Sequence, residues 1–329
     1  MIQKINKIKN PRWLYLLLAV LLSNATDTIA QNGKLLHKET VTLNDTIEKR
    51  LSERPEYKEY QNVQRTTELY KITYQSDGLR VNGYLAMPRG PGNHPVIIYN
   101  RGGNRNFGSI SDIRATFFLR SMASWGYIVV ASNYRGGGGS EGMEEFGGND
   151  VNDILNLIPL VENIKNADTT RMGIYGWSRG GLMTYRTLTE TCKFKAAIIG
   201  AGMANSFRTI EERPEMEKNV YSELVPNYDN NKEEELRKRS AVYWVDKLCK
   251  TTPIMLLHGS GDWRVSPKDA MEMADSLYSR QHPFRLHFYE GGDHGLTEYR
   301  EQTDNEIRAF LDYYVRDMKT HPDMQPHGR

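Results

Sequence analysis

The sequence has little of several features that would assign it to a specialised class of protein. Only two of its 329 residues are cysteines, too few for a disulfide-rich scaffold. Histidines and cysteines do not recur at metal-ligand spacing, so nothing indicates a metal hydrolase, and no cofactor is expected. The formal net charge is only +2, which gives no reason to expect nucleic acid as a partner. Internal repeats and low-complexity tracts are also lacking.

A hydrophobic run long enough for a comfortable membrane span is missing as well. The most apolar stretch, Trp13 to Leu22, is shorter than the roughly 20 residues that a span requires. It is preceded by four basic residues, Lys4, Lys7, Lys9 and Arg12, and followed by a small-x-small site ending at Ala30. This order predicts a cleaved secretory signal over residues 1–30, with an uncleaved anchor as the alternative. We therefore expect an exported protein, periplasmic or extracellular, with no stable membrane span after cleavage.

The sequence leaves the redox state of the two cysteines open. Cys192 and Cys249 each precede an apolar run, at residues 196–199 and 254–257. If these runs form neighbouring parallel strands, both thiols lie at the same edge of the sheet. An oxidising compartment would then permit a bridge. Two reduced, partly buried thiols are equally compatible with the sequence.

Alternating strand and helix patterns dominate the chain from about residue 66. Residues 31–65 are polar and charged, and a weak helical pattern around Ile47, Leu51 and Tyr57 predicts an N-terminal arm or helix, whereas residues 69–87 are predicted to form a hairpin. Buried strands then alternate with amphipathic helices, the strands being expected at 96–99, 127–131, 172–175, 196–199, 254–258 and 284–289. This rhythm predicts an α/β-hydrolase domain over 66–329, with a mostly parallel sheet and helices on both faces. A charged interruption at 203–249 predicts a helical cap insertion.

The first chemical signal is the stretch Gly176-Trp177-Ser178-Arg179-Gly180-Gly181. A strand pattern leads into it and a helix pattern leaves it, which is the context of a Gly-x-Ser-x-Gly nucleophile elbow. Glycine is required at the flanks because the strand and the helix approach closely there. Ser178 is therefore the expected nucleophile. An ordinary glycine-rich turn is the alternative, since so short a pattern often occurs by chance.

A serine nucleophile needs a base, and the base needs a partner that orients it. In a parallel α/β sheet these groups lie on loops at the carboxyl ends of later strands. Two such loops supply Asp262 and His294, giving the nucleophile, acid, histidine order of an α/β hydrolase. Asp293 is a rival acid, but it adjoins His294 and is badly placed to reach its ring. His258 is a rival base, which we interpret as structural.

The oxyanion of the tetrahedral intermediate requires two backbone donors, each worth roughly 3 kcal/mol of the barrier. One expected donor is the N–H of Arg179, the residue after the nucleophile. The other is expected from the glycine loop after the strand at 96–99, with Gly103 favoured over Gly102.

Arginines recur on the loops predicted at the active face. They are Arg101, Arg105, Arg135, Arg179 and Arg264. One interpretation is salt bridges to acidic residues between positions 141 and 150. The other is a guanidinium fork for a substrate carboxylate, with Arg101, Tyr134 and Trp177 as substrate-binding candidates.

Several ordered segments resemble the catalytic domain of the prolyl oligopeptidase family of serine peptidases. They are Asn133-Tyr134-Arg135-Gly136, Gly176-Trp177-Ser178, Arg239-Ser240 with Tyr243 to Lys247, His258-Gly259-x-x-Asp262-x-Arg264-Val265, and Gly292-x-His294-Gly295. The resemblance implies triad roles for Ser178, Asp262 and His294. Peptidases of this family usually carry a β-propeller before this domain, and we expect none here. Arg101 also stands where relatives have tyrosine or histidine supporting the oxyanion.

These observations predict an exported, cofactor-independent serine hydrolase. The leading substrate class is short peptides or aminoacyl derivatives. A carboxylesterase acting on small or sugar esters is the alternative, and a non-catalytic binding protein on the same fold is a third. The sequence gives no indication of the oligomeric state.

Overall fold

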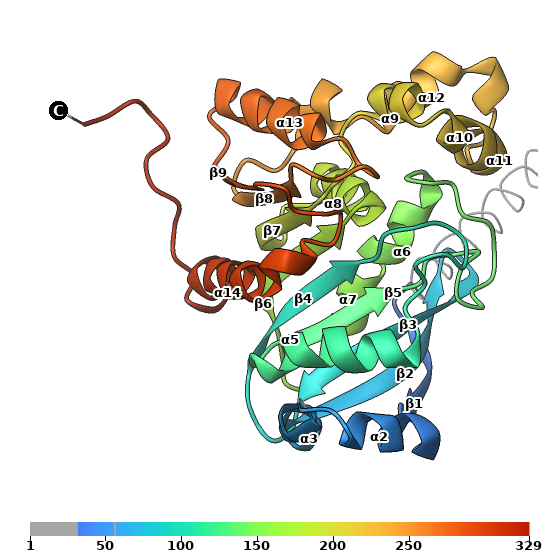
Figure 1. Cartoon of the computed structure of the whole chain (residues 1–329), viewed down its shortest axis with the longest axis vertical. Coiled ribbons are helices and arrows are strands. Elements are labelled where there is room, and N and C mark those ends of the chain that lie inside the picture. Colours follow the sequence, from blue (N-terminus) through green and yellow to red (C-terminus); the bar gives the residue numbers. More distant parts are fainter. Residues whose placement is uncertain (1–31, 56, 329) are drawn as a thin grey trace, which may run out of the picture.

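A nine-stranded sheet runs through the computed structural model, which describes residues 32–55 and 57–328 (Figure 1). The predicted signal at residues 1–30 lies outside the described residues. The strand order is β1-β2-β3-β5-β4-β6-β7-β8-β9. The strands are β1 (Leu35–Thr40), β2 (Thr67–Ser76), β3 (Leu79–Pro88), β4 (His94–Asn100), β5 (Ile128–Ser132), β6 (Ala167–Trp177), β7 (Phe194–Gly200), β8 (Ile254–Gly259) and β9 (Phe284–Tyr289).

The sheet is antiparallel at its N-terminal edge and parallel over the rest. The predicted hairpin is confirmed, since β2 and β3 pair antiparallel from Thr67↔Pro88 to Ser76↔Leu79. β1 pairs antiparallel with β2, and β3 pairs antiparallel with β5. From β5 through β4, β6, β7 and β8 to β9 every pairing is parallel. The carboxyl ends of β4, β6, β8 and β9 therefore meet at one edge of the sheet, where the predicted site loops begin.

Helices cover both faces of the sheet, as predicted. They are α2 (Asp45–Ser52), α3 (Tyr57–Thr66), α4 (Asp112–Arg114), η1 (Ala115–Leu119), α5 (Arg120–Ser124), η2 (Asn149–Val151), α6 (Asn152–Leu155), α7 (Leu157–Glu162), α8 (Arg179–Glu190), α13 (Pro267–Ser279), η7 (Thr297–Tyr299), α14 (Arg300–Leu311) and η8 (Asp312–Arg316), besides those of the cap. Among the described residues, no helix has both the length and the hydrophobicity that a membrane crossing requires.

Two apolar cores form because side chains alternate along each strand. On β4, Ile98 packs into a core with residues of α7, α8 and α13, whereas Ile97 packs into a second core with residues of η1, α5 and α14. Figure 1 shows α5 and α14 on one side of the sheet. A buried strand with apolar residues at consecutive positions is the pattern expected of a sheet covered on both faces.

The N-terminal segment forms helices where the weak helical pattern lies, and in addition an edge strand that the sequence did not predict. It supplies the edge strand β1 as well as the helices α2 and α3, and β1 pairs with β2 from Leu35↔Tyr74 to Thr40↔Tyr70. The sequence of β1, LLHKET, has no fully buried position. An exposed edge strand lacks the apolar pattern of a core strand, so its periodicity gave no strand prediction.

Short helices fill the segment between β7 and β8, which holds the predicted insertion and is called the cap below. They are α9 (Ser206–Glu212), α10 (Pro214–Met216), η3 (Glu217–Tyr221), α11 (Ser222–Leu224), η4 (Tyr228–Asn230), α12 (Lys232–Lys238), η5 (Ala241–Tyr243) and η6 (Val245–Lys247). Figure 1 shows α9 to α12 grouped above α8. A third apolar core packs Met203, Val220 and Tyr221 of this segment with Phe146 and with Leu182 of α8. The segment therefore lies over α8, the helix that begins directly after Ser178.

The two cysteines form a disulfide, with their Cα atoms 5.4 Å apart. Cys192 precedes β7 and Cys249 precedes β8. These strands are parallel neighbours, which brings the preceding residues to the same edge of the sheet. Of the two redox states that the sequence left open, the structure has the bridged one.

Candidate active site

Ser178 occupies a strained turn between β6 and α8. Its backbone angles are φ 60° and ψ −125°, a region that costs a non-glycine residue of order 1–3 kcal/mol. A Cβ on Gly176 would lie 2.0 Å from the carbonyl oxygen of Gly180, and one on Gly180 would lie 2.0 Å from that of Asn100. Side chains at these two positions would therefore force strand and helix apart. The turn has the strand, sharp turn, helix form of a nucleophile elbow.

Asp262 and His294 come together from the loops after β8 and β9. Because these strands are parallel neighbours, their following loops lie side by side. His294 Nδ1 is 2.8 Å from Asp262 Oδ2. The other oxygen, Oδ1, accepts the backbone N–H groups of Arg264 at 2.8 Å and Val265 at 3.1 Å. The carboxylate is therefore held in one orientation, with one oxygen directed at the imidazole.

His258 is a second histidine on the same carboxylate. Its Nε2 lies 3.2 Å from Asp262 Oδ2 and 3.1 Å from the carbonyl oxygen of Val265. Sequence reasoning assigned His258 a structural place but missed this contact, although the four-residue spacing of His258 and Asp262 was visible. The side chain is fully buried, and its Nδ1 has no hydrogen-bond partner within the described part of the chain.

Asp262 is ionised at neutral pH despite its burial. Burial alone would raise its pKa, but hydrogen bonds from His258 and His294, the nearby charge of His294 and the N–H of Val265 together hold the pKa well below its usual range. A permanently charged partner can fix the tautomer of His294 and stabilise its imidazolium form.

The rival acid, Asp293, is engaged elsewhere. Its Oδ1 accepts the backbone N–H groups of Gly295 and Thr297, each at 2.9 Å, so it shapes the turn that carries His294. Trp177 ties that turn to the nucleophile strand, because its Nε1 donates to the carbonyl oxygen of His294 at 2.8 Å. The adjacent carboxylate therefore orders the loop, while Asp262 meets the ring.

Arg179, Gly102 and Gly103 all border the cavity that contains Ser178. A Cβ on Gly102 would lie 3.0 Å from the Cβ of Ser178, whereas one on Gly103 would meet the carbonyl oxygen of Phe107 at 2.1 Å. Gly102 is thus the glycine that faces the serine side chain, and Gly103 shapes the loop, with φ +72°. The assignment of the second oxyanion donor to Gly103 stays a prediction.

Arg101 and Tyr134 do not reach the cavity, which corrects the expectation that they bind substrate. Arg101 is fully buried and donates to the backbone carbonyl oxygens of Asn133 at 2.8 Å, Arg105 at 2.9 Å and Gly102 at 3.1 Å. Tyr134 is equally buried, and its hydroxyl donates to the carbonyl oxygen of Arg101. The sequence located both loops correctly, but it contained no information on the direction of these side chains.

Behind Ser178, a buried ion-pair network holds two of the five loop arginines, Arg101 and Arg179. Arg179 pairs with Glu144 at 2.7 Å and with Asp150, and Arg101 lies 3.5 Å from Glu144. Both guanidinium groups also stack on the Tyr134 ring, at 4.9 and 5.1 Å. The salt-bridge interpretation therefore holds for these two arginines, and the network fixes the loop of Gly102 against the elbow.

The remaining arginines divide between ion pairs and the cavity. Arg135 pairs with Asp77 and Asp153, and Arg105 pairs with Glu223 of the cap. Arg264 has no carboxylate within 4 Å among the described residues, and its guanidinium stacks on Trp263 at 5.1 Å. Of the five arginines, Arg264 is the one whose side chain is free of an ion pair at the cavity wall.

The cavity has a volume of about 550 Å³. Ser178 and His294 lie in its wall, together with Trp177 and the cap residues Met203 and Met216. A serine hydroxyl, an imidazole paired with a carboxylate, and apolar side chains therefore line one cavity that is large enough for a small acyl group. In the described part of the chain, no three His, Cys, Asp or Glu side chains are arranged to hold a metal ion.

Comparison with known sequences connects this site to a family. The family model described as "Prolyl oligopeptidase family" matches residues 114–321, a range that includes Ser178, Asp262 and His294. The chain is 32% identical over 222 residues to the uncharacterized peptidase YtmA of Bacillus subtilis, covering 67% of this chain and 84% of that protein. Other curated relatives are longer, and the chain spans only 28% to 38% of their length.

Solved structures share the fold at low sequence identity. The acylaminoacyl peptidase of Pyrococcus horikoshii superposes with a TM-score of 0.67 at 24% identity, covering 79% of this chain and 44% of that chain. The rice cell wall degrading esterase LipA of Xanthomonas oryzae superposes with a TM-score of 0.63 at 16% identity, covering 88% and 99%. Similarities at this level of identity concern the fold alone, and this fold is an α/β hydrolase.

Proposed function

The chain belongs to the prolyl oligopeptidase family and is a serine hydrolase, and from this premise we propose that it cleaves amide bonds of short peptides or aminoacyl derivatives. Ser178 is the nucleophile, His294 the general base and acid, and Asp262 the partner that orients His294. The observation that carries this proposal is the 2.8 Å contact between His294 Nδ1 and Asp262, in a cavity shared with a serine on a strained elbow.

In the first half of the reaction, Ser178 Oγ attacks the carbonyl carbon and its proton passes to His294 Nε2. The oxyanion is stabilised by the N–H of Arg179 and by a second N–H from the Gly102–Gly103 loop. The C–N bond then breaks, and His294 gives its proton to the departing nitrogen. An amine is released, and the acyl group remains as an ester on Ser178.

In the second half, water attacks the acyl carbon and gives a proton to His294. The bond from carbon to Ser178 Oγ breaks, and the proton returns to that oxygen. The products are a carboxylic acid and the free enzyme. Asp262 keeps its charge throughout, which agrees with the low pKa derived above.

The peptide substrate class is supported by the relatives, several of which are named peptidases. An esterase acting on small or sugar esters is the second candidate function. One observation favours it: the superposition with the esterase LipA covers 88% of this chain and 99% of LipA, so the two chains share nearly their whole fold. Both candidates use the same acyl-enzyme chemistry and differ in the leaving group.

The test is turnover of two substrate panels, aminoacyl or dipeptidyl nitroanilides and nitrophenyl esters. Ser178→Ala removes the nucleophile, and Ser124→Ala, on the exposed end of α5, is the matched control. Nitroanilide turnover that is lost only in Ser178→Ala supports the peptidase. Ester turnover alone assigns the protein to the esterases. If a fluorophosphonate fails to label Ser178, the nucleophile assignment is wrong.

Export is the second part of the proposal. It is supported by the signal pattern at residues 1–30 and by the disulfide, a bond that persists in oxidising compartments. The N-terminal sequence of protein recovered from the periplasm or the medium tests it directly. The expected first residue is Gln31, and a mature protein that retains residues 1–30 would contradict cleavage.

A further inference from the structure

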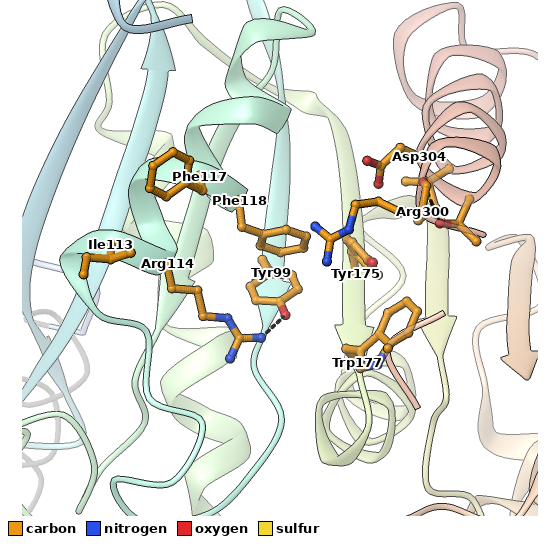
Figure 2. A pocket seen from close by; sticks show the side chains of 12 residues that line it. Tyr99, Ile113, Arg114, Phe117, Phe118, Tyr175, Trp177, Arg300 and Asp304 are labelled. Atoms are coloured by element: carbon orange, nitrogen blue, oxygen red, sulfur yellow. Dashed lines mark hydrogen bonds between the residues drawn. The ribbon is translucent and has the colours of Figure 1, made fainter. Parts of the chain in front are cut away.

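A second cavity adjoins the catalytic one. Its volume is about 400 Å³, and it shares three lining residues with the first cavity, Arg114, Trp177 and Gly295 (Figure 2). Trp177 directly precedes Ser178, and Gly295 directly follows His294. The two cavities therefore meet beside the residues that flank Ser178 and His294.

The floor and the walls of the second cavity are aromatic. Tyr99 of β4 and Tyr175 of β6 form the floor, with their ring centroids 5.3 Å apart. Phe118 of η1 closes over Tyr99 at 4.7 Å, and Trp177 lies 6.3 Å from Tyr175. Edge-to-face contacts of this kind are favourable for a further ring. The cavity thus has the size and the surface to hold one aromatic group.

Two guanidinium groups enter the same cavity from opposite walls. Figure 2 shows Arg114 of α4 on one side of Tyr99 and Arg300 of α14 on the other. Arg114 donates to the Tyr99 hydroxyl at 3.2 Å. No ion pair among the described residues includes Arg114 or Arg300, and the ion pairs of α14 and η8 join Arg308 and Arg316 to Asp312. Asp304 is the acidic residue of the lining, and burial raises its pKa while Arg300 opposes that rise.

The position of the cavity relative to the triad identifies which half of the substrate it would hold. Three residues line the catalytic cavity but not the second one: Met203 and Met216 of the cap, and Val265. The second cavity is bordered by Gly295 and by residues of α14. His294 gives its proton to the leaving group in the proposed reaction. Gly295, the neighbour of His294, lines the second cavity, so this cavity lies next to the group that would give its proton to the leaving nitrogen.

We propose that this cavity is the leaving-group subsite for an aromatic amino acid whose free carboxylate is bound by Arg114 and Arg300. Guanidinium groups bind carboxylates through paired N–H donors, and the aromatic floor accepts the ring. The preferred substrates are then acylated or aminoacylated aromatic amino acids, in which the scissile bond is the last one of the chain. The inference rests on the proposed hydrolase function and specifies its substrate class.

The direct test measures, by NMR titration, how tightly two probes bind to full-length Ser178→Ala protein. The probes are 3-phenylpropanoate and its neutral analogue 3-phenylpropanamide. We expect the carboxylate to bind at least tenfold more tightly than the amide. Arg300→Gln should reduce this preference about fivefold or more. Arg308→Gln, on the same helix but paired with Asp312 at 3.7 Å, is the matched control and should leave the preference unchanged.

Equal affinity for both probes would overturn the assignment. A preference for the carboxylate that survives both Arg114→Gln and Arg300→Gln would also overturn it. Failure to bind either probe at millimolar concentration does so as well. Arg114 is partly exposed and Arg300 is exposed, so we expect both variants to fold. Their unfolding temperatures, which should equal that of the parent protein, check this independently of binding.

The kinetic test uses wild-type enzyme and the acyl group selected by the nitroanilide panel. That group is joined to phenylalanine, to phenylalaninamide and to alanine. We expect kcat/KM for the phenylalanine compound to exceed the other two at least tenfold, and equal values overturn the subsite. If instead no amide is cleaved and no fluorophosphonate labels Ser178, the hydrolase proposal fails, while probe binding still decides on the cavity.

Discussion

Substitution of Arg101 distinguishes a structural role for its buried guanidinium from the substrate-binding role that the sequence pattern suggested. The pattern suggested a substrate-binding arginine, whereas the structure gives a fully buried side chain that binds backbone carbonyl groups. Burial, and then the nearby charge of Arg179, lower its pKa to about 10, so it remains charged at neutral pH. Arg101→Met keeps an unbranched stem in place of the arginine stem and removes the guanidinium, with its charge and every donor.

The expected cost follows from the contacts that are lost. Each buried carbonyl group left without a donor costs about 1–3 kcal/mol. Removing one partner of a buried ion pair costs about 3–5 kcal/mol, here the pair with Glu144. These two estimates overlap, because they describe the same guanidinium, so we expect a loss of about 3–5 kcal/mol. For a large domain that corresponds to a fall in Tm of about 6–20 °C.

Thermal unfolding measures the stability, and a pair of substrates that differ by one carboxylate measures the specificity. Arg101→Met should lower kcat for both substrates alike, since the loop of Gly102 loses its support. Arg105→Met is the matched control on the same loop, because its pair with Glu223 is exposed and contributes at most about 1 kcal/mol. A Tm within about 2 °C of wild type, with KM raised only for the anionic substrate, would refute the reasoning.

Three further predictions concern the triad and the disulfide. Asp262→Asn should lower kcat/KM about 10³–10⁴-fold. Because the native pKa of Asp262 is depressed, its contribution to stability is complete above about pH 4 and is lost as the pH falls below it. The difference in unfolding free energy between wild type and Asp262→Asn should therefore narrow from pH 7 to pH 3, and a constant difference would contradict this. His258→Ala removes one hydrogen bond to the charged carboxylate of Asp262, and such a bond contributes about 1.5–3 kcal/mol. If the whole of this energy is lost in the transition state, kcat/KM falls about tenfold to hundredfold. An effect equal to that of His294→Ala would make His258 the base instead. Replacing Cys192 and Cys249 by alanine should lower the unfolding free energy by about 2–4 kcal/mol, and unfolded wild type should show free thiols only after reduction.

The order and type of most core elements could be predicted from the sequence. Buried parallel strands appear as short apolar runs because both of their faces are covered, and each predicted run overlaps an observed strand. The elbow was equally visible, since close contact of strand and helix restricts Gly176 and Gly180 to glycine. Where exposure removed the apolar signal, as in the edge strand β1, prediction failed.

The loops that carry Ser178, Asp262 and His294 could also be located from the sequence, because a parallel sheet brings the carboxyl ends of its strands to one edge. The direction of each side chain could not. Arg101 points into the protein and binds Asn133, while Arg264 stays at the cavity wall, although both follow strands on the same edge. Such choices depend on contacts between residues far apart in the chain, which no local pattern records.

The sequence by itself determined the α/β architecture, the elbow and the order of the triad candidates, because periodicity and glycine requirements are local. Only the tertiary structure decided that His258 shares the carboxylate of Asp262, that the two cysteines are bridged, and that Arg114 and Arg300 face one aromatic cavity. In each of these three cases the physical reason is the same. The interaction joins groups whose distance is set by the packing of loops and helices around the sheet, and not by their spacing in the chain.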